Sequence, residues 1–467
     1  YGKSFPDVAR AMLGLFPSPP DLVAFPNNQE DVVNILDWAD QNNIAVVPYG
    51  GGSSVCGGVE TNVDDSYSGV VSLDLKNLNQ VLEIDKESRA ARIQAGIYGP
   101  ALEEELKKSN LTLRHFPQSF EHSTLGGWIA TRSGGHFATL YTHIDDFVES
   151  TTMVTPTGVI ESRRLPGSGA GPSPDRLVIG SEGILGVITE AWMRLQERPK
   201  YRASCPVLFD DYYKALNATR LISQSALFPA NCRLLDANEA LFNGAGDGSK
   251  HLLILSFESA DHEMHVWLNR ALEIAADSGG QYELPQENKD DAHKSGASGT
   301  WRNSFIRAPY YREASVRRGI IQDTFETSIT WDKGFDFIQS LKEKASKAIK
   351  EISGKESRVT CRLTHTYPDG LAPYFSYSAY ATPSTMIDVW KDIKLVTNEI
   401  CVEEGGTVTH HHAVGRDHRV KGYDLQRPEG FENMLVSAKE GVDPRSIMNP
   451  GVLIDPKGKK HKHWMED

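Results

Sequence analysis

The sequence predicts an α+β protein of two domains, and three features of its 467 residues carry that prediction. Short segments with helical and strand spacing alternate over residues 20–200, which is typical of mixed α and β architecture. The composition changes near residues 196–205, and a second alternation with longer polar connections follows. The chain is 39% hydrophobic and long enough to bury two cores. We therefore expect three segments, of which the last returns to the first: 1–200, 201–424 and 425–467.

The first domain is expected to begin with a helix over residues 28–41. In this segment Val32, Leu36 and Ala39 recur at helical spacing, so one face is apolar. Residues 44–48 form a short apolar run that leads into three glycines, which indicates a strand followed by a tight loop. Three strands and one polar-faced helix follow in this order: 69–75, 82–85, 92–95 and, for the helix, 101–108.

The second domain is expected to contain two long helices and a sheet. The spacing predicts an amphipathic helix over 335–352 and a second helix over 384–404, which Gly405-Gly406 ends. Strands are expected between them, at 359–366 and 374–380. Other predicted elements are a polar Gly/Ser-rich loop at 285–300 and, in the tail from about 430, one helix and turns.

Charge and cysteine usage exclude several classes of protein. The net charge of −13 argues against nucleic-acid binding, and no apolar run approaches the ~18 residues of a membrane-spanning helix. The five cysteines are scattered, which argues against a disulfide framework or a thiolate metal site and favours a reducing compartment. We expect an intracellular protein, soluble or peripheral on a membrane, cytoplasmic in a bacterium or peroxisomal in a eukaryote. The chain begins without Met, so an N-terminal signal is not visible.

A glycine-rich loop is the first candidate binding site. The run Pro48-Tyr49-Gly50-Gly51-Gly52-Ser53-Ser54 follows the strand at 44–48. Consecutive glycines let backbone amides approach a ligand closely and form a nest for a pyrophosphate. The run fits neither the P-loop nor the dinucleotide fingerprint, and a flexible surface loop is the alternative reading.

Two further segments share this character. One runs from Pro117-Gln118-Ser119 through Ser123 to Thr131, and the other spans 180–190. Both combine small residues and hydroxyls with an apolar stretch, which suits a long planar ligand that needs close backbone approach.

In order and spacing, the three segments resemble the FAD domain of the vanillyl-alcohol oxidase superfamily. The resemblance implies a two-domain flavoprotein in which an FAD-binding domain (1–200, joined again by 425–467) is combined with an α/β cap domain (201–424). It also implies non-covalent FAD, because the first loop has no His of the kind to which some relatives attach the flavin. The implied FAD contacts are Pro48, Gly50, Gly51, Gly52, Ser53, Ser54, Gln118, Ser119, Ser123, Thr124, Gly126, Gly127, Thr131, Glu182 and Ile188.

The second half carries further ionisable candidates. Arg307 and Arg312 lie in a mixed apolar and aromatic segment and could bind an anion, although a surface ion pair is the simpler reading. Tyr374 follows the strand Thr360-Cys361-Arg362-Leu363-Thr364 and could exchange a proton, with aromatic packing as the alternative. Three adjacent histidines could bind phosphate, move protons or bind a metal, or simply be solvated; they are His410, His411 and His412.

Jointly, from about residue 20 to residue 452, these motifs resemble the alkyldihydroxyacetonephosphate synthases (alkylglycerone-phosphate synthases) of ether-lipid synthesis. The resemblance implies exchange of the acyl chain of acyl-dihydroxyacetone phosphate for a long-chain alcohol, redox-neutral through a flavin–substrate adduct. It implies a homodimer and no metal. By position, Tyr374 matches the acid/base, Arg312 the phosphate-binding arginine with Arg307 as the other register, and Arg233 an arginine that supports the cap. The histidine run matches the family motif, with His411 and His412 catalytic and all three histidines near the phosphate.

Some residues depart from the family pattern. Ala413 stands where the animal members have Gly, Arg416 where they have Lys, and Phe-Ser-Tyr follows at 375–377. These departures indicate a divergent branch.

Two other functions remain open. An FAD-dependent D-2-hydroxy acid dehydrogenase or oxidase shares the fold, but its metal-binding histidine motif is incomplete at 365–370. A non-catalytic flavin-binding module is the second alternative, against which the many ionisable candidates argue. Separately, the basic tail 457–464 could contact anionic headgroups as a peripheral membrane segment, or be a solvated terminus.

Overall fold

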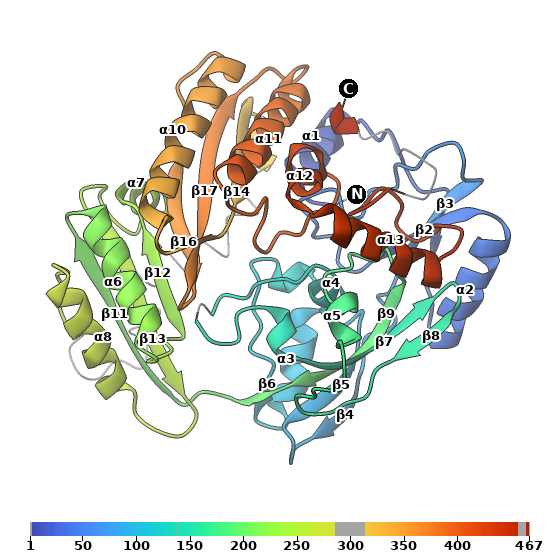
Figure 1. The fold of residues 1–467 in the computed structure, drawn as a ribbon, viewed down its shortest axis with the longest axis horizontal. Helices are drawn as coiled ribbons and strands as arrows, with labels where there is room; N and C mark the ends of the chain where they lie inside the picture. The colour runs from blue at the N-terminus through green and yellow to red at the C-terminus, as the bar shows by residue number, and fades with distance from the viewer. Residues whose placement is uncertain (1, 138, 285–312, 456–463, 467) are drawn as a thin grey trace. The chain divides into compact units, whose positions relative to one another are not determined.

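The computed structural model describes residues 2–137, 139–284, 313–455 and 464–466, and the chain forms two compact units (Figure 1). Unit 1 comprises Tyr1–Gly134, His143–Gln196 and His411–Asp467. Unit 2 comprises Gly135–Thr142 and Glu197–His410. The loop predicted at 285–300 lies outside the described residues. Both units combine helices with sheets, so the predicted α+β class is confirmed.

Unit 1 is built on two sheets. The smaller is parallel, with strand order β1-β3-β2, and the larger has the order β4-β5-β9-β7-β8 and is antiparallel. The strands of the parallel sheet are β1 (Leu22–Ala24), β2 (Ile44–Tyr49) and β3 (Gly69–Asp74). Those of the antiparallel sheet are β4 (Val81–Asp85), β5 (Ala90–Gln94), β7 (Val148–Thr155), β8 (Gly158–Glu161) and β9 (Val187–Arg194).

Helices and short strands complete unit 1. Helix α2 begins at an Asn28 cap that accepts from the Asp31 amide, so the start predicted at 28 is one residue early. The helices are α1 (Phe5–Leu13), α2 (Gln29–Gln41), α3 (Gly99–Lys107), α4 (Leu125–Ala130), α5 (Asp175–Val178), α12 (Asp424–Gln426) and α13 (Glu429–Val442). A two-stranded pair joins β6 (Leu111–Thr112), in this unit, to β10 (Gln196–Glu197).

The core of unit 1 joins segments far apart in the sequence. Leu36 of α2 packs in one buried cluster with Val46 of β2, Val187 of β9 and Met448 of the C-terminal tail. The tail also forms a parallel bridge between Met448 and Val46. The last part of the chain is therefore built into unit 1. The chain returns to this unit at His411, whereas the sequence predicted the return at 425.

Unit 2 is built on one large sheet with the strand order β11-β13-β12-β16-β17-β14, in which β15 also pairs with β17. Its pairings are antiparallel. The strands are β11 (Tyr201–Phe209), β12 (Asn231–Leu235), β13 (His251–Ser259), β14 (Ile320–Glu326), β15 (Ile329–Thr330), β16 (Thr360–Thr366) and β17 (Gly370–Tyr380).

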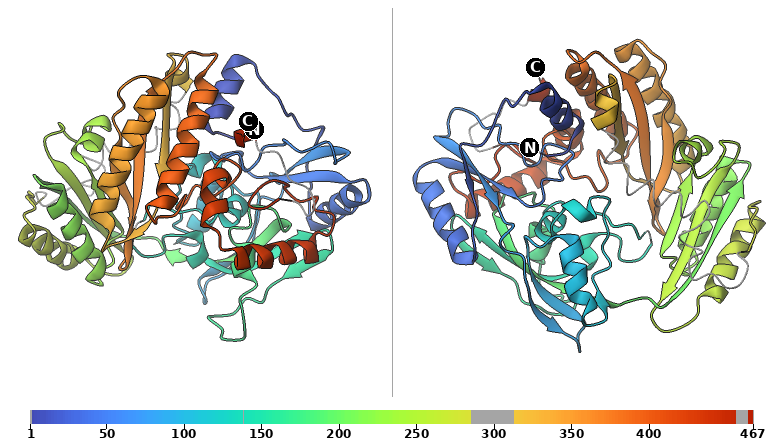
Figure 2. Two further views of the ribbon diagram at one scale, coloured as in Figure 1. Left: turned by 45° about the horizontal axis from the view of Figure 1, so that its top comes forward. Right: turned by 180° about the vertical axis from the view of Figure 1, so that it is seen from behind.

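Helices pack on this sheet in two pairs. Helices α6 (Tyr212–Gln224) and α8 (His265–Asp277) contact each other and β11 to β13, and α7 (Ala237–Phe242) lies at β12, β13 and β16. Helices α10 (Gly334–Ser353) and α11 (Met386–Glu403) run side by side along β17 and β14 (Figure 2). Within the described ranges, no helix combines the length and apolar content that crossing a bilayer would require.

Candidate functional site

The glycine-rich loop lies against the second predicted segment of unit 1. A side chain added at Gly50 would collide with the Thr124 hydroxyl, and one added at Gly51 with the carbonyl of His122. Gly52 has a φ of 63°, a backbone conformation that favours glycine. The three glycines are therefore required by the close approach of two chain segments and by the turn itself.

Three consecutive backbone amides distinguish this loop. Among the described residues, no protein acceptor is found for the backbone N–H groups of Gly51, Gly52 and Ser53. Ser54 instead holds the loop together, because its hydroxyl accepts from the amide of Gly58 at 3.0 Å. Adjacent unpaired amides are the arrangement that binds a pyrophosphate.

The second segment forms the short helix α4 with Thr124 as its cap. The Thr124 hydroxyl accepts from the Gly127 amide, and the Ser123 hydroxyl accepts from the Trp128 indole at 2.7 Å. Thr131 donates to the carbonyl of Gly127 at 2.8 Å. Side chains of the predicted FAD contacts thus order the backbone that the glycine loop touches. Gln118 and Ser119 precede this helix and are half-buried.

The third segment contacts the first two within unit 1. The Glu182 amide donates to the carbonyl of Ala130 at 2.8 Å, so this loop joins the end of α4. A side chain at Gly183 would press on the ring of Pro48, which begins the glycine loop. Ile188 lies in β9 and is buried. The three predicted segments are thus brought together in unit 1.

These residues fit FAD. A pyrophosphate needs unpaired amides with room for close approach, and a planar ring system needs small residues along its length. The loop at 51–53 supplies the first, and the glycines at 50–52, 126 and 183 let the small-residue segments pack closely together, as the second requires.

The end of the histidine run also belongs to unit 1. Glu182 has both carboxylate oxygens occupied by backbone amides, of Val414 at 2.9 Å and Gly415 at 2.7 Å. Burial raises the pKa of Glu182 to about 7, although the two amides act to lower it. The Cys56 thiol donates to the carbonyl of His412 at 3.1 Å. Cys56 and Glu182 therefore hold the backbone of residues 412–415.

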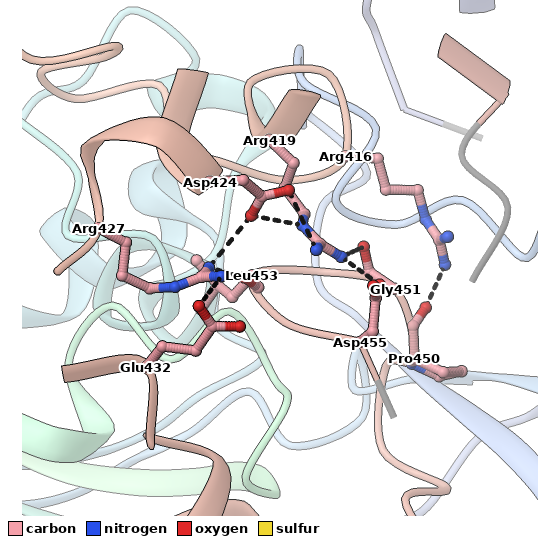
Figure 3. A network of polar contacts seen from close by, with 9 residues as sticks. All are labelled: Arg416, Arg419, Asp424, Arg427, Glu432, Pro450, Gly451, Leu453 and Asp455. Atoms are coloured by element: carbon pink, nitrogen blue, oxygen red, sulfur yellow. Dashed lines mark hydrogen bonds and ion pairs between the residues drawn. The ribbon is translucent and has the colours of Figure 1, made fainter. Parts of the chain in front are cut away.

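Buried arginines hold the chain that follows. Figure 3 shows Arg416, Arg419 and Arg427 of unit 1, all with 8% or less of their surface exposed. Arg416 donates to the carbonyls of Pro450 at 2.6 Å and Glu60 at 3.5 Å, and Arg419 pairs with two carboxylates at 2.7 and 3.2 Å. These contacts tie residues 416–432 to residues 450–455. The acceptors drawn are Asp424, Glu432, Pro450, Gly451, Leu453 and Asp455.

In unit 2, Tyr374 lies between two charged residues. In the register of the sheet it is the direct partner of Arg362 on β16 and of Glu326 on β14. Direct partners on neighbouring strands face the same side of a sheet. Burial raises the pKa of the Tyr374 phenol, and Glu326 adds to this effect, while Arg362 opposes it.

Glu326 holds the start of the histidine run within unit 2. Its carboxylate accepts from the Thr409 hydroxyl at 2.8 Å and from the His410 amide at 3.2 Å. The His410 ring lies 2.7 Å from the Tyr367 hydroxyl and 5.0 Å, between centroids, from the ring of His365. His410 is therefore an ordered group rather than a solvated imidazole.

Arg233 is buried on β12 among neutral acceptors. It donates to the His136 ring at 3.3 Å and to the carbonyl of Thr364 at 3.3 Å. Desolvation, with repulsion from Arg362, lowers the pKa of Arg233 to about 9. These contacts join β12, β16 and the segment 135–142.

The other predicted site residues divide between the units. His411 and His412 belong to unit 1, whereas Tyr374 and His410 belong to unit 2. Arg307 and Arg312 lie outside the described residues. No role was predicted for Arg362, Glu326 or Glu239. Arg362 stands in the predicted strand at 359–366, but only the register of β16 and β17 places it beside Tyr374.

Comparison with known families matches both halves of the chain. The FAD binding domain family matches residues 20–162, and the C-terminal domain family of FAD linked oxidases matches residues 198–453. The first match contains the glycine loop and α4, and the second contains Tyr374 and the histidine run.

Individual relatives extend these matches over nearly the whole chain. The alkyldihydroxyacetonephosphate synthase of Dictyostelium discoideum is 31% identical, over 97% of this chain and 76% of the relative. A solved structure of an alkyldihydroxyacetonephosphate synthase superposes with a TM-score of 0.76, at 27% identity, over 96% of this chain and 80% of that one. Glycolate oxidase subunit GlcD of Bacillus subtilis is 27% identical, over 95% of this chain and 91% of the relative.

Proposed function

The chain belongs to the alkyldihydroxyacetonephosphate synthase family and is an FAD-dependent enzyme of that type, and we propose that it acts in ether-lipid synthesis. Its reaction is the exchange of the acyl chain of acyl-dihydroxyacetone phosphate for a long-chain alcohol. The observation that carries this proposal is the 31% identity to such a synthase over 97% of the chain. The two-domain vanillyl-alcohol-oxidase-type fold is the one that this family membership requires.

The proposed exchange balances without an external oxidant. The bond from the substrate carbon to the ester oxygen breaks, and the fatty acid leaves as a carboxylate. The alcohol oxygen forms the new bond to the same carbon, and the alcohol proton is released. FAD, when bound, supplies an electrophilic ring that makes this substitution feasible with no net redox change.

Residues of this chain supply the remaining functions in the proposal. Tyr374 exchanges a proton with the carbon beside the ketone, since a phenol in a buried site can act as acid and base. Arg312, or Arg307 in the other register, binds the phosphate together with the histidine run, in which His411 and His412 contact the reacting part. The glycine loop holds the FAD pyrophosphate non-covalently.

The proposal extends to organisation. Residues 1–200 with 425–467 form the FAD-binding domain, and residues 201–424 form the cap. The enzyme is an intracellular homodimer that meets its lipid substrate at a membrane surface, for which the tail at 457–464 is the candidate contact; its residues up to 463 lie outside the described part of the chain.

An anaerobic incubation tests the proposed reaction. FAD-loaded protein is mixed with palmitoyl-dihydroxyacetone phosphate and hexadecanol, without an electron acceptor, and products are measured by mass spectrometry. We expect the alkyl ether and free palmitate in equal amounts. Absence of the ether from FAD-replete protein would overturn the proposal. Acid precipitation that leaves flavin on the protein would contradict non-covalent binding alone.

Oxidation of a D-2-hydroxy acid is the second candidate function. The 27% identity to a glycolate oxidase subunit favours it. Glycolate and D-lactate, mixed anaerobically with the FAD-loaded protein, would then bleach the flavin absorbance.

A further inference from the structure

The guanidinium of Arg362 lies over the ring of Tyr374 on the neighbouring strand. The guanidinium carbon is 4.0 Å from the centroid of the Tyr374 ring, and the two residues are direct partners in the register of β16 and β17. A cation over an aromatic face is attracted by the negative charge of that face. Because Arg362 is 8% exposed and Tyr374 is 5% exposed, water screens this interaction little.

A carboxylate fixes Arg362 in this position. Glu239 of α7 is 1% exposed, and its Oε1 lies 2.5 Å from a guanidinium nitrogen of Arg362. Asn243 donates to the same oxygen at 3.1 Å, and the Thr360 hydroxyl donates to the other. Desolvation is the largest single effect and acts to lower the pKa of Arg362, but the attraction and hydrogen bond of Glu239, together with Tyr374 and Cys361, raise the pKa overall. The arginine therefore stays charged.

We propose that Arg362 is a positioning residue for Tyr374: together with Glu239 it holds a permanent cation against the phenol ring and favours the phenolate, the form that accepts a proton. This inference rests on the proposed role of Tyr374 in proton transfer. It adds a chemical reason why a buried tyrosine could serve as a base at all, since burial alone favours the neutral phenol.

The groups around Tyr374 act in opposite directions. Burial has the largest effect and raises the pKa of the phenol; Arg362 from β16 lowers it, as does a hydrogen bond with Thr324. Glu326 and Asp323, both from β14, raise it. Arg362 is the cation among these groups, so its removal leaves the Thr324 hydrogen bond to oppose burial and the two carboxylates.

The decisive variant removes both members of the ion pair. Arg362→Met alone would leave Glu239 buried and unpaired, which commonly destabilises a fold, whereas replacement of both partners is tolerated better. Glu239→Gln keeps one acceptor oxygen for Asn243, and the Thr360 hydroxyl can accept from the new amide nitrogen, so Arg362→Met/Glu239→Gln leaves no unpaired charge. Lys342→Met is the matched control, because Lys342 is a cation of the same unit that pairs with Asp236 at 2.7 Å.

Ionisation of Tyr374 can be read without any activity. Fluorine NMR follows protein containing 3-fluorotyrosine, whose phenol is more acidic than that of tyrosine, and Tyr374→Phe identifies the signal by its loss. We expect the double variant to move the titration of this signal upward by on the order of one pH unit. Arg362→Lys keeps the charge but replaces the planar guanidinium, so in this variant the titration of the phenol at 374 should move upward by less. In the control variant, Lys342→Met, the titration of the Tyr374 signal should not move.

The outcomes separate this inference from the proposed function. An unchanged titration in the double variant would overturn the role of Arg362. Should the double variant fail to fold, Arg362→Gln removes the charge but keeps a donor for Glu239, and an unchanged titration in that variant would do the same. If Tyr374→Phe retains full exchange activity, the proposed role of Tyr374 fails, while the fluorine titration still decides whether Arg362 favours the phenolate.

Discussion

The carboxylate of Glu182 accepts a hydrogen bond of 2.7 Å from the backbone amide of Gly415, more than two hundred residues later in the chain. The Val414 amide donates to the other carboxylate oxygen. One buried side chain thus holds the backbone that directly follows the histidine run, within the same unit as the glycine loop.

Replacement of this carboxylate should loosen that backbone. In Glu182→Gln the amide nitrogen would face one of the two N–H donors, so one hydrogen bond is lost in a buried place. We expect the free energy of unfolding to fall by about 1–3 kcal/mol. Urea unfolding followed by fluorescence measures the change. Equal stability of Glu182→Gln and the natural protein would contradict the importance of this contact.

The glycine loop should be intolerant of the smallest side chain. A Cβ at Gly51 would collide with the carbonyl of His122 and displace the loop amides. We expect Gly51→Ala to bind FAD about tenfold more weakly or worse, a loss of about 1.4 kcal/mol. Titration of the apoprotein with FAD, read by flavin fluorescence, gives the dissociation constant.

Gly169→Ala is the control for this experiment. A Cβ added at Gly169 would meet no other atom within 4 Å, and the residue is exposed. The Gly169→Ala protein should bind FAD with the same affinity as the natural protein. Retention of full affinity by Gly51→Ala would show that the loop does not bind the pyrophosphate.

Tyr374→Phe should separate chemistry from cofactor binding. The substitution removes the phenol oxygen but keeps the ring that packs under Arg362. We expect the exchange rate to fall by about 10²–10⁴-fold, the usual effect of losing a general acid or base. FAD content, measured by absorbance, should be unchanged. A loss of FAD with the activity would indicate a structural role instead.

His115 should make the protein sensitive to acid. It is fully buried beside Trp128, its Nε2 lies 2.8 Å from the Ser133 hydroxyl, and desolvation lowers its pKa to about 3. In the unfolded chain a histidine binds a proton below about pH 6.5. Between these values the unfolded state binds more protons, so the free energy of unfolding decreases as the pH falls.

The size of this effect can be measured. Between pH 7 and pH 5 the His115 contribution should fall by about 2 kcal/mol. His115→Gln should remove this part of the pH dependence, whereas the exposed His262→Gln should retain it. Denaturant unfolding at several pH values gives the slope, and identical slopes for His115→Gln and the natural protein would contradict the prediction.

The sequence allowed most elements of the fold to be predicted, because their apolar spacing is regular. The helix predicted at 335–352 is α10, one residue longer at each end, and the strand predicted at 44–48 is β2. Resemblance to the vanillyl-alcohol oxidase superfamily added the fold type, which family membership confirms together with FAD. Strand ends were less accurate: β17 begins at Gly370, four residues before the prediction.

The surroundings of Tyr374 could not be predicted from local patterns. The contact with Arg362 depends on the register between β16 and β17, which shifts at Leu363 and His365. A bulge of this kind changes which residues face each other and leaves no clear mark in the sequence. Glu239 reaches the same place from α7, through packing that only the folded sheet defines.

The fate of the alcohol oxygen tests the central claim most directly. FAD-loaded protein is incubated anaerobically with acyl-dihydroxyacetone phosphate and hexadecanol that carries a heavy oxygen isotope. The account predicts that the label appears in the alkyl ether, that the released fatty acid contains none, and that the flavin stays oxidised after turnover. Label in the fatty acid, or no ether at all, would contradict the exchange reaction.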